Sequence, residues 1–184
     1  MELINNTTKT LKDDLSVEIK KGSKLSIAAA CFSIYAFQEL KKQLTSIEEL
    51  RFIFTSPTFV AEKTKKEKRE FYIPRLNRER SLYGTEFEIK LRNEMTQKAI
   101  AKECADWIKE KVTFKSNISD KTIQGQLVVD DIGYTPINNF TTVELGCEKG
   151  NVISTTIVKD QSLAQTLIRD FNEIWNDKKV LQEV

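Results

Sequence analysis

Four polar side chains flank the short apolar run of residues 127–129, and their types limit the chemistry that they can do. They are Gln124, Gln126, Asp131 and Asn139. The apolar residues 127–129, with Gly125 before them and two aspartates after them, predict a buried strand that delivers polar side chains to one end. Amides donate and accept hydrogen bonds, but they carry no charge and are negligible nucleophiles. Phosphate oxygens therefore suit them as ligands, although an ordinary core strand with two Gln at its mouth fits the same pattern.

This stretch resembles the motif strand of phospholipase-D-like enzymes, which carries His-x-Lys-x-x-x-x-Asp and leads into a Gly/Ser-rich turn ending in Asn. Gln124 stands at the place of the His, Gln126 at that of the Lys and Asp131 at that of the Asp. Asn139 lies slightly before the place of the trailing Asn, and NNFTTVELG resembles the family's Ser-Asn-Phe-Thr segment. The chain contains no His, so no shifted alignment restores that residue.

The resemblance implies a phosphodiesterase site that has lost its reactive groups. In the family the His attacks phosphorus to form a covalent intermediate, and the Lys stabilises charge on the phosphoryl oxygens. Losing residues that act together typically removes several orders of magnitude in rate. We therefore expect a non-catalytic chain, folded as one phospholipase-D-like α/β domain over residues 1–184. Its mixed sheet would have helices on both faces.

Further similarities extend the resemblance to the phospholipase-D-like domains fused to bacterial superfamily-two helicases of the Swi/Snf-like branch. These domains share a Phe-Ser-Ile helix start, an arginine-rich insertion with a Tyr-Gly-x-Glu step, and a closing helix in which Phe171 and Trp175 match a Phe-x-x-x-Trp ending. The resemblance implies that this chain is the N-terminal part of a longer protein of DNA restriction, repair or defence. ATP and Mg²⁺ would belong to its helicase motor, with no cofactor in this chain. The mixed charged and apolar ending KKVLQEV agrees with a chain that continues.

A basic stretch over residues 61–80 holds eight Lys or Arg against four Asp or Glu, and Phe71 and Tyr72 lie within it. Basic residues interleaved with aromatics can follow a phosphate backbone and offer stacking surfaces. A solvated helix face followed by a loop is the alternative. The candidate nucleic-acid-binding residues are Lys63, Lys65, Lys66, Lys68, Arg69, Arg75, Arg78 and Arg80.

Composition and missing motifs narrow the classes of protein and of binding site that fit this chain. Hydrophobic content of 40%, charged content of 30% and a net charge of +2 are typical of a globular protein and do not by themselves indicate a polyanion partner. The sequence has no phosphate-binding or dinucleotide-binding glycine motif. Its three scattered cysteines, Cys31, Cys104 and Cys147, predict neither disulfides nor a zinc site. Neither a membrane-spanning run nor a leader is present, so we expect an intracellular, cytoplasmic protein.

Alternating helices and strands are predicted for the rest of the chain. Helices are expected near 7–20 (capped by Thr7 or Thr8), 33–44 (capped by Ser33), 96–111 and 160–175 (capped by Asp160 or Ser162), and strands near 24–30, 49–55, 112–117 and 152–158. The strand-helix-strand order of 24–55 predicts parallel pairing with a right-handed crossover. Residues 82–93 fit either a strand or the start of the following helix.

Three functional hypotheses remain open from the sequence. The first is a non-catalytic module that binds DNA or RNA or targets the fused helicase. The second is an active phosphodiesterase or nuclease that uses another nucleophile or a metal. It would need acids such as Asp131, Glu86 or Glu88 to converge. The third is a structural domain that docks onto the motor or forms a homodimer.

Overall fold

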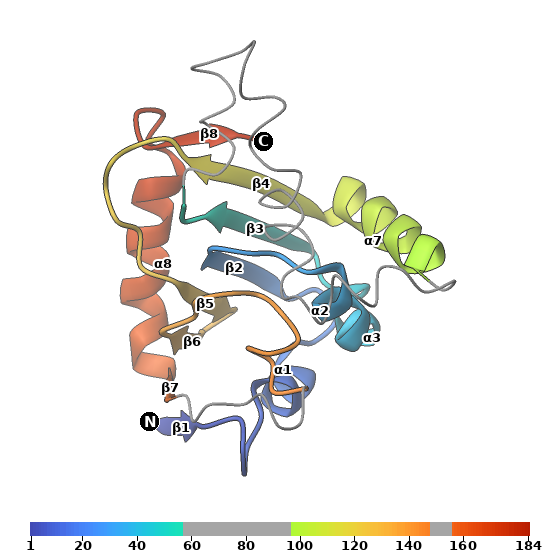
Figure 1. Cartoon of the computed structure of the whole chain (residues 1–184). Coiled ribbons are helices and arrows are strands. Elements are labelled where there is room, and N and C mark those ends of the chain that lie inside the picture. The colour runs from blue at the N-terminus through green and yellow to red at the C-terminus, as the bar shows by residue number, and fades with distance from the viewer. Residues whose placement is uncertain (57–96, 148–155) are drawn as a thin grey trace.

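A mixed β-sheet of eight strands is the framework of the computed structural model, which describes residues 1–56, 97–147 and 156–184 (Figure 1). The strands are β1 Glu2–Ile4, β2 Lys24–Ala29, β3 Glu49–Phe54, β4 Val112–Asn117, β5 Gln126–Val129, β6 Ile132–Thr135, β7 Ile157–Asp160 and β8 Leu181–Glu183. Their order across the sheet is β1-β7-β6-β5-β2-β3-β4-β8. The described helices are α1 Leu11–Glu18, α2 Ile34–Glu39, α3 Lys41–Leu44, α7 Gln97–Lys111 and α8 Gln161–Trp175.

The centre of the sheet is parallel and its flanks are antiparallel. Strands β2 and β3 pair in parallel, as the strand-helix-strand order of 24–55 predicted, and β4 pairs in parallel with β3. Strand β5 pairs antiparallel with β2, so that Gln126 lies opposite Ala28 near the carboxyl end of β2. Strands β6, β7 and β1 continue antiparallel on one side, and β8 pairs antiparallel with β4 on the other.

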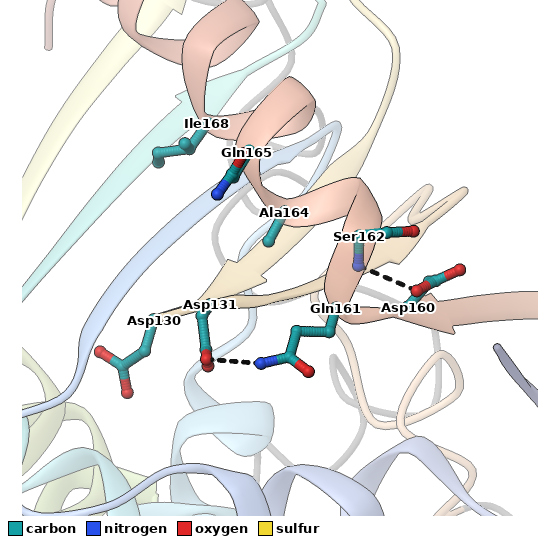
Figure 2. Close-up of a pocket in the computed structure, with 8 residues that line it drawn as sticks. All are labelled: Asp130, Asp131, Asp160, Gln161, Ser162, Ala164, Gln165 and Ile168. Atoms are coloured by element: carbon teal, nitrogen blue, oxygen red, sulfur yellow. Dashed lines mark hydrogen bonds between the residues drawn. The ribbon is translucent and has the colours of Figure 1, made fainter.

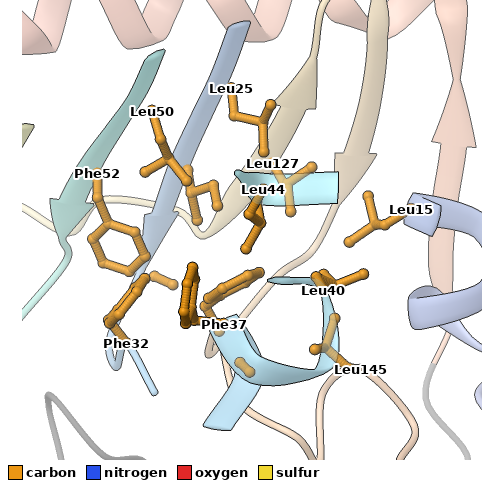
Figure 3. Packing of buried hydrophobic residues seen from close by; sticks show 14 of the residues in the cluster. Leu15, Leu25, Phe32, Phe37, Leu40, Leu44, Leu50, Phe52, Leu127 and Leu145 are labelled. Carbon is orange, nitrogen blue, oxygen red and sulfur yellow. The ribbon is translucent and has the colours of Figure 1, made fainter. Parts of the chain in front are cut away.

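The larger core lies between the sheet and the helices α1, α2, α3 and α7 (Figure 1, Figure 3). An aromatic cluster occupies its centre, where Phe32 meets Phe52 edge-on at 5.5 Å between ring centroids and Phe37 lies 4.7 Å from Trp107. The indole N–H of Trp107 donates to the carbonyl oxygen of Leu44 at 2.8 Å, which satisfies this buried polar group.

Helix α8 covers the opposite face of the sheet, which we call the α8 face (Figure 1). Phe171 packs there in a smaller cluster with Ala28 and Ile53. Gly133 allows close approach, because a Cβ at this position would lie 2.8 Å from Cδ1 of Leu167 and 3.3 Å from the backbone nitrogen of Ala164. The predicted α/β class, a mixed sheet with helices on both faces, is confirmed.

Local hydrogen bonds explain where the boundaries differ from the predictions. Helix α1 is capped by Thr10 rather than by Thr7 or Thr8, because the side chain of Asn5 accepts from the backbone N–H groups of both earlier threonines. The caps predicted at Ser33 and Asp160 are confirmed. The predicted helix over 33–44 divides at Leu40, where ψ is 15° and α2 gives way to α3.

Three short strands, β1, β6 and β8, were not predicted, because three or four residues carry little periodicity. Strand β7 includes the end of the strand predicted over 152–158, whose first four residues lie outside the described part, as does 82–93. No helix in the described ranges has the length and hydropathy needed to cross a membrane.

Candidate functional site

Amide side chains gather at one end of the sheet, which we call the amide rim and define by Gln124, Gln126, Asn117, Asn138 and Asn139. Strands β2, β3, β4 and β6 all end there, and β5 begins there because it runs antiparallel to β2. The carboxyl ends of the strands in an open α/β sheet are the usual location of ligand sites. This end of the sheet is therefore the candidate functional site.

The two glutamines at the motif positions differ in their surroundings. Gln126 is 8% exposed, and its Nε2 donates to the carbonyl oxygen of Leu167 in α8 at 3.0 Å. Gln124 is exposed and makes a long contact of 3.4 Å from Nε2 to the hydroxyl of Thr135. Gln124 can therefore turn toward a ligand at a small cost in free energy. Gln126, by contrast, already holds α8 against the sheet.

Residues 137–140 bring Asn139 to the same rim. The backbone N–H of Ile137 donates to the carbonyl of Gly125 at 3.1 Å, and the N–H of Ala30 donates to the carbonyl of Asn138 at 2.8 Å. Phe140 then forms a parallel bridge with Phe32. Three of the four predicted motif positions, Gln124, Gln126 and Asn139, therefore lie at one end of the sheet.

Gly125 is required for this close approach of backbones. A Cβ at position 125 would lie 1.6 Å from the carbonyl oxygen of Ile137 and 3.3 Å from that of Ala28. We expect Gly125→Ala to lower the free energy of unfolding by about 3 kcal/mol, because backbone atoms must move to admit the methyl group. Urea unfolding measures the change. Gly22→Ala is the control: its φ of +80° makes alanine strained, but the space around it is open, so about 1 kcal/mol is expected. Equal losses in the two variants would contradict this role of Gly125.

Asp131 lies at the opposite end of β5, so the prediction that the strand delivers its polar side chains to one end is wrong for this residue. Strand β5 covers Gln126–Val129, roughly 10 Å of extended chain, and Asp131 follows in the turn after Asp130. The Asp131 carboxylate accepts a hydrogen bond from Nε2 of Gln161 at 2.9 Å (Figure 2). It lines a cavity of about 690 Å³ with Asp130, Asp160 and the first turn of α8.

Asp130, which the motif comparison passed over, makes the structural contacts of this turn. Its φ of 51° places it in the left-handed region, which Asp tolerates better than most residues. Its carboxylate accepts from the hydroxyl of Ser23 at 2.7 Å and from the N–H of Lys24 at 2.9 Å, and so fastens the β5–β6 turn to the start of β2. Adjacent aspartates between two apolar runs are the sequence signal that indicates such a turn.

No metal-binding cluster of three His, Cys, Asp or Glu side chains is found within residues 1–56, 97–147 and 156–184. The pair Glu86 and Glu88 lies outside the described residues. A metal-dependent nuclease therefore gains no ligand set from the part of the chain that the structure describes.

Glu144 is a titratable group close to the rim that the sequence did not single out. Its Oε1 accepts a hydrogen bond from the backbone N–H of Asn138 at 3.1 Å. Burial raises the pKa of the Glu144 carboxyl, and the hydrogen bond from Asn138 opposes that rise. Its contacts hold the segment that carries the rim asparagines, and no spacing in the sequence indicated this.

A buried charged cluster joins helix α1 to strands β6 and β7. The hydroxyl of Tyr134 donates to Asp14 at 2.5 Å, and Nζ of Lys159 contacts both Asp14 at 3.0 Å and Glu18 at 2.9 Å. Burial alone would raise the pKa of Asp14, but hydrogen bonds from Tyr134, Lys159 and Lys9 outweigh it and hold that pKa below its usual value. Burial and the bond to Asp14 raise the pKa of Tyr134.

The predicted nucleic-acid-binding residues between Lys63 and Arg80 lie outside the described part of the chain, but their attachment point is visible. Strand β3 ends at the amide rim, where the carbonyl of Thr55 accepts from Nδ2 of Asn117 at 3.0 Å. Residues 57–96 follow directly and contain ten Lys or Arg against seven Asp or Glu. The rest of the chain has 29 − 10 = 19 basic and 27 − 7 = 20 acidic residues. The excess positive charge therefore lies in residues 57–96, which follow β3 in the sequence.

Comparisons with known proteins add little to these observations. No family model and no curated protein matches the chain. One similar solved structure is that of TrmBL2, an archaeal chromatin protein described as showing a novel mode of DNA binding. It is 12% identical, with a TM-score of 0.42, and the match covers 100% of this chain and 54% of that one. A functional assignment therefore depends on the residues of this chain.

Proposed function

We propose that this chain is a degenerate, non-catalytic phospholipase-D-like domain that binds nucleic acid at its amide rim. The observation that carries the proposal is that β3 ends at the rim and is followed in the sequence by residues 57–96, which hold the chain's excess of positive charge. Lys and Arg side chains provide most of the affinity for a phosphate backbone, and neutral donors set its position. Gln124, which is exposed at the same rim, is such a donor.

The side chains at the motif positions support binding rather than catalysis. The chain has no His, and Gln126 is already hydrogen bonded to α8. Asp131 lies at the other end of β5, where it accepts from Gln161. With Gln at the places of the His and the Lys, the family's covalent phosphohistidine cannot form.

In this proposal the domain serves a bacterial helicase of the Swi/Snf-like branch, and ATP and Mg²⁺ act in that motor rather than here. The motor, and a second copy of this domain, are its proposed protein partners. Helicase motifs in the reading frame beyond Val184 would support this context, and their absence there would count against it.

Fluorescence anisotropy with labelled single-stranded and double-stranded DNA and RNA tests the proposal over a series of salt concentrations. We expect the logarithm of the association constant to fall linearly with the logarithm of the salt concentration. A neutral control protein should show no such binding. Equal signals from the control and from this chain at low salt would overturn the proposal.

The same samples, incubated with divalent metals, test for nuclease activity. We expect no cleavage of the labelled strands. Cleavage that is abolished by Asp131→Asn and kept by Asp170→Asn, an exposed residue on α8, would instead establish an active enzyme.

A further inference from the structure

Two cations and an indole lie together on the α8 face, away from the residues that led to the proposed function. Arg51 in β3 and Lys115 in β4 point to this face, and they are diagonal neighbours because Arg51 pairs with Thr113. The guanidinium of Arg51 lies 5.6 Å from the Trp175 ring and 5.0 Å from the Phe171 ring. The ammonium of Lys115 lies 4.4 Å from the Trp175 ring.

Neither cation forms an ion pair with a carboxylate in the part of the chain that the structure describes. Arg51 donates to the hydroxyl of Ser26 at 3.1 Å, and Lys115 donates to the carbonyl oxygen of Trp175 at 2.9 Å. Glu183 lies opposite Lys115 across the β4–β8 pair, but the ammonium is turned to α8 instead. Burial lowers the pKa of Arg51, as expected for a cation that has lost water, and the charge of Glu49 opposes this shift.

Part of this charge has a structural use, because a cation at the carboxyl end of α8 interacts favourably with the helix dipole. That use needs only Lys115. Arg51 forms no ion pair within the described residues, and its guanidinium has five N–H donors, one of which binds the Ser26 hydroxyl. Arg51, Lys115 and Trp175 are all half-buried rather than enclosed. A cavity of about 300 Å³ opens beside Lys115, and its polar lining also includes Lys178, Gln182 and Glu183.

We infer that Arg51, Lys115 and Trp175 form a phosphodiester-binding surface, on which adjacent phosphates of a nucleic-acid strand contact the two cations and the indole contacts a sugar or base. Half-buried cations gain more from an anion than fully solvated ones, since water screens them less. An indole that already lies against two cations offers its remaining surface for stacking. This inference rests on the proposed function and adds a second contact region that does not depend on residues 57–96.

Anisotropy with an oligo-dT strand tests the inference in the 184-residue chain. We expect Arg51→Gln combined with Lys115→Gln to weaken binding roughly 30-fold at about 0.1 M salt and to reduce the salt slope by about 1.5. The charge-preserving pair Arg51→Lys and Lys115→Arg should stay close to the wild type. The matched control is Lys102→Gln with Lys109→Gln, two exposed lysines of α7, which should change binding little.

A measurement without substitutions covers the case in which the Gln variant folds poorly. Trp107 is 5% exposed, so quenching of tryptophan emission reports mainly on Trp175. Iodide should quench more strongly than caesium because of the nearby cations, and oligo-dT should protect against iodide. Binding by the wild type that neither changes in the Gln variant nor protects Trp175 overturns this inference and leaves the proposed function standing. Absence of any binding by the wild type overturns both.

Discussion

Replacing Lys63, Lys65, Lys66 and Lys68 together by Gln is expected to weaken DNA binding about 10³-fold at roughly 0.1 M salt. Each phosphate contact contributes about 0.9 to the slope of log affinity against log salt for duplex DNA, so that slope should fall by about 3.6. Each lysine that neutralises a phosphate releases condensed counterions from the DNA. The neutral amides of the variant release none, so affinity and salt slope both fall. Anisotropy titrations at several salt concentrations give the affinity and the slope together.

The matched control removes the same four charges elsewhere. Lys20, Lys42, Lys102 and Lys109 are exposed, and none has an ion-pair partner in the described part of the chain. Changing these four to Gln alters the net charge equally but leaves residues 57–96 unchanged. We expect a loss below tenfold. Equal losses in the two variants would show that overall charge, and not a local surface, governs binding.

Most of the central sheet could be predicted from the sequence, because β2 and β3 are largely buried apolar runs and β4 alternates Val112 and Phe114 on one face. Residues 24–30, 49–55 and 112–117 were predicted within one residue of β2, β3 and β4. Such apolar runs remain visible wherever they lie in the chain. Caps formed by a single side chain and the next turn, as at Ser33 and Asp160, were equally visible.

The site was only partly predictable, because a residue pattern does not show at which end of a strand each side chain lies. Gln126 and Asp131 belong to one motif, yet the length of β5 places them at opposite ends. Contacts between residues distant in the chain could not be read at all. The hydrogen bond from Gln126 to Leu167 and the contact of Arg51 with Trp175 depend on how α8 crosses the sheet.

Replacing Asp14 by Ala is expected to lower the free energy of unfolding by about 3–5 kcal/mol. The side chain of Asp14 is 5% exposed and that of Lys159 is 11% exposed, so solvent screens this pair little. The substitution leaves the buried hydroxyl of Tyr134 without its partner and Lys159 with Glu18 alone. Urea unfolding gives the loss. Glu2→Gln, which removes only an exposed partner of Lys9, should change the free energy of unfolding far less than Asp14→Ala.

A second variant distinguishes the cost of leaving buried groups without partners from the contribution of the charges to stability. Asp14→Leu, Tyr134→Phe and Lys159→Met together replace the three most buried groups of the cluster by apolar side chains, while the more exposed Lys9 and Glu18 remain. Replacing a buried ion pair by apolar side chains of similar size is often neutral. The triple variant should therefore be clearly more stable than Asp14→Ala. A triple variant as unstable as the single one would mean that the charged cluster stabilises the fold in its own right.

The pH dependence of the difference between the wild type and Asp14→Ala follows from the signs of the pKa shifts. The pKa of Asp14 is lowered in the folded protein, so its contribution is present above about pH 4, the unfolded value, and is lost as pH falls through the folded pKa. The pKa of Lys159 is raised, so its contribution is complete below about pH 10 and disappears at more alkaline pH. The stability difference should therefore be largest and nearly flat from about pH 5 to pH 9. A difference that instead grows on acidification below pH 4 would contradict the assigned ionisation of Asp14, since a protonated carboxyl cannot pair with Lys159.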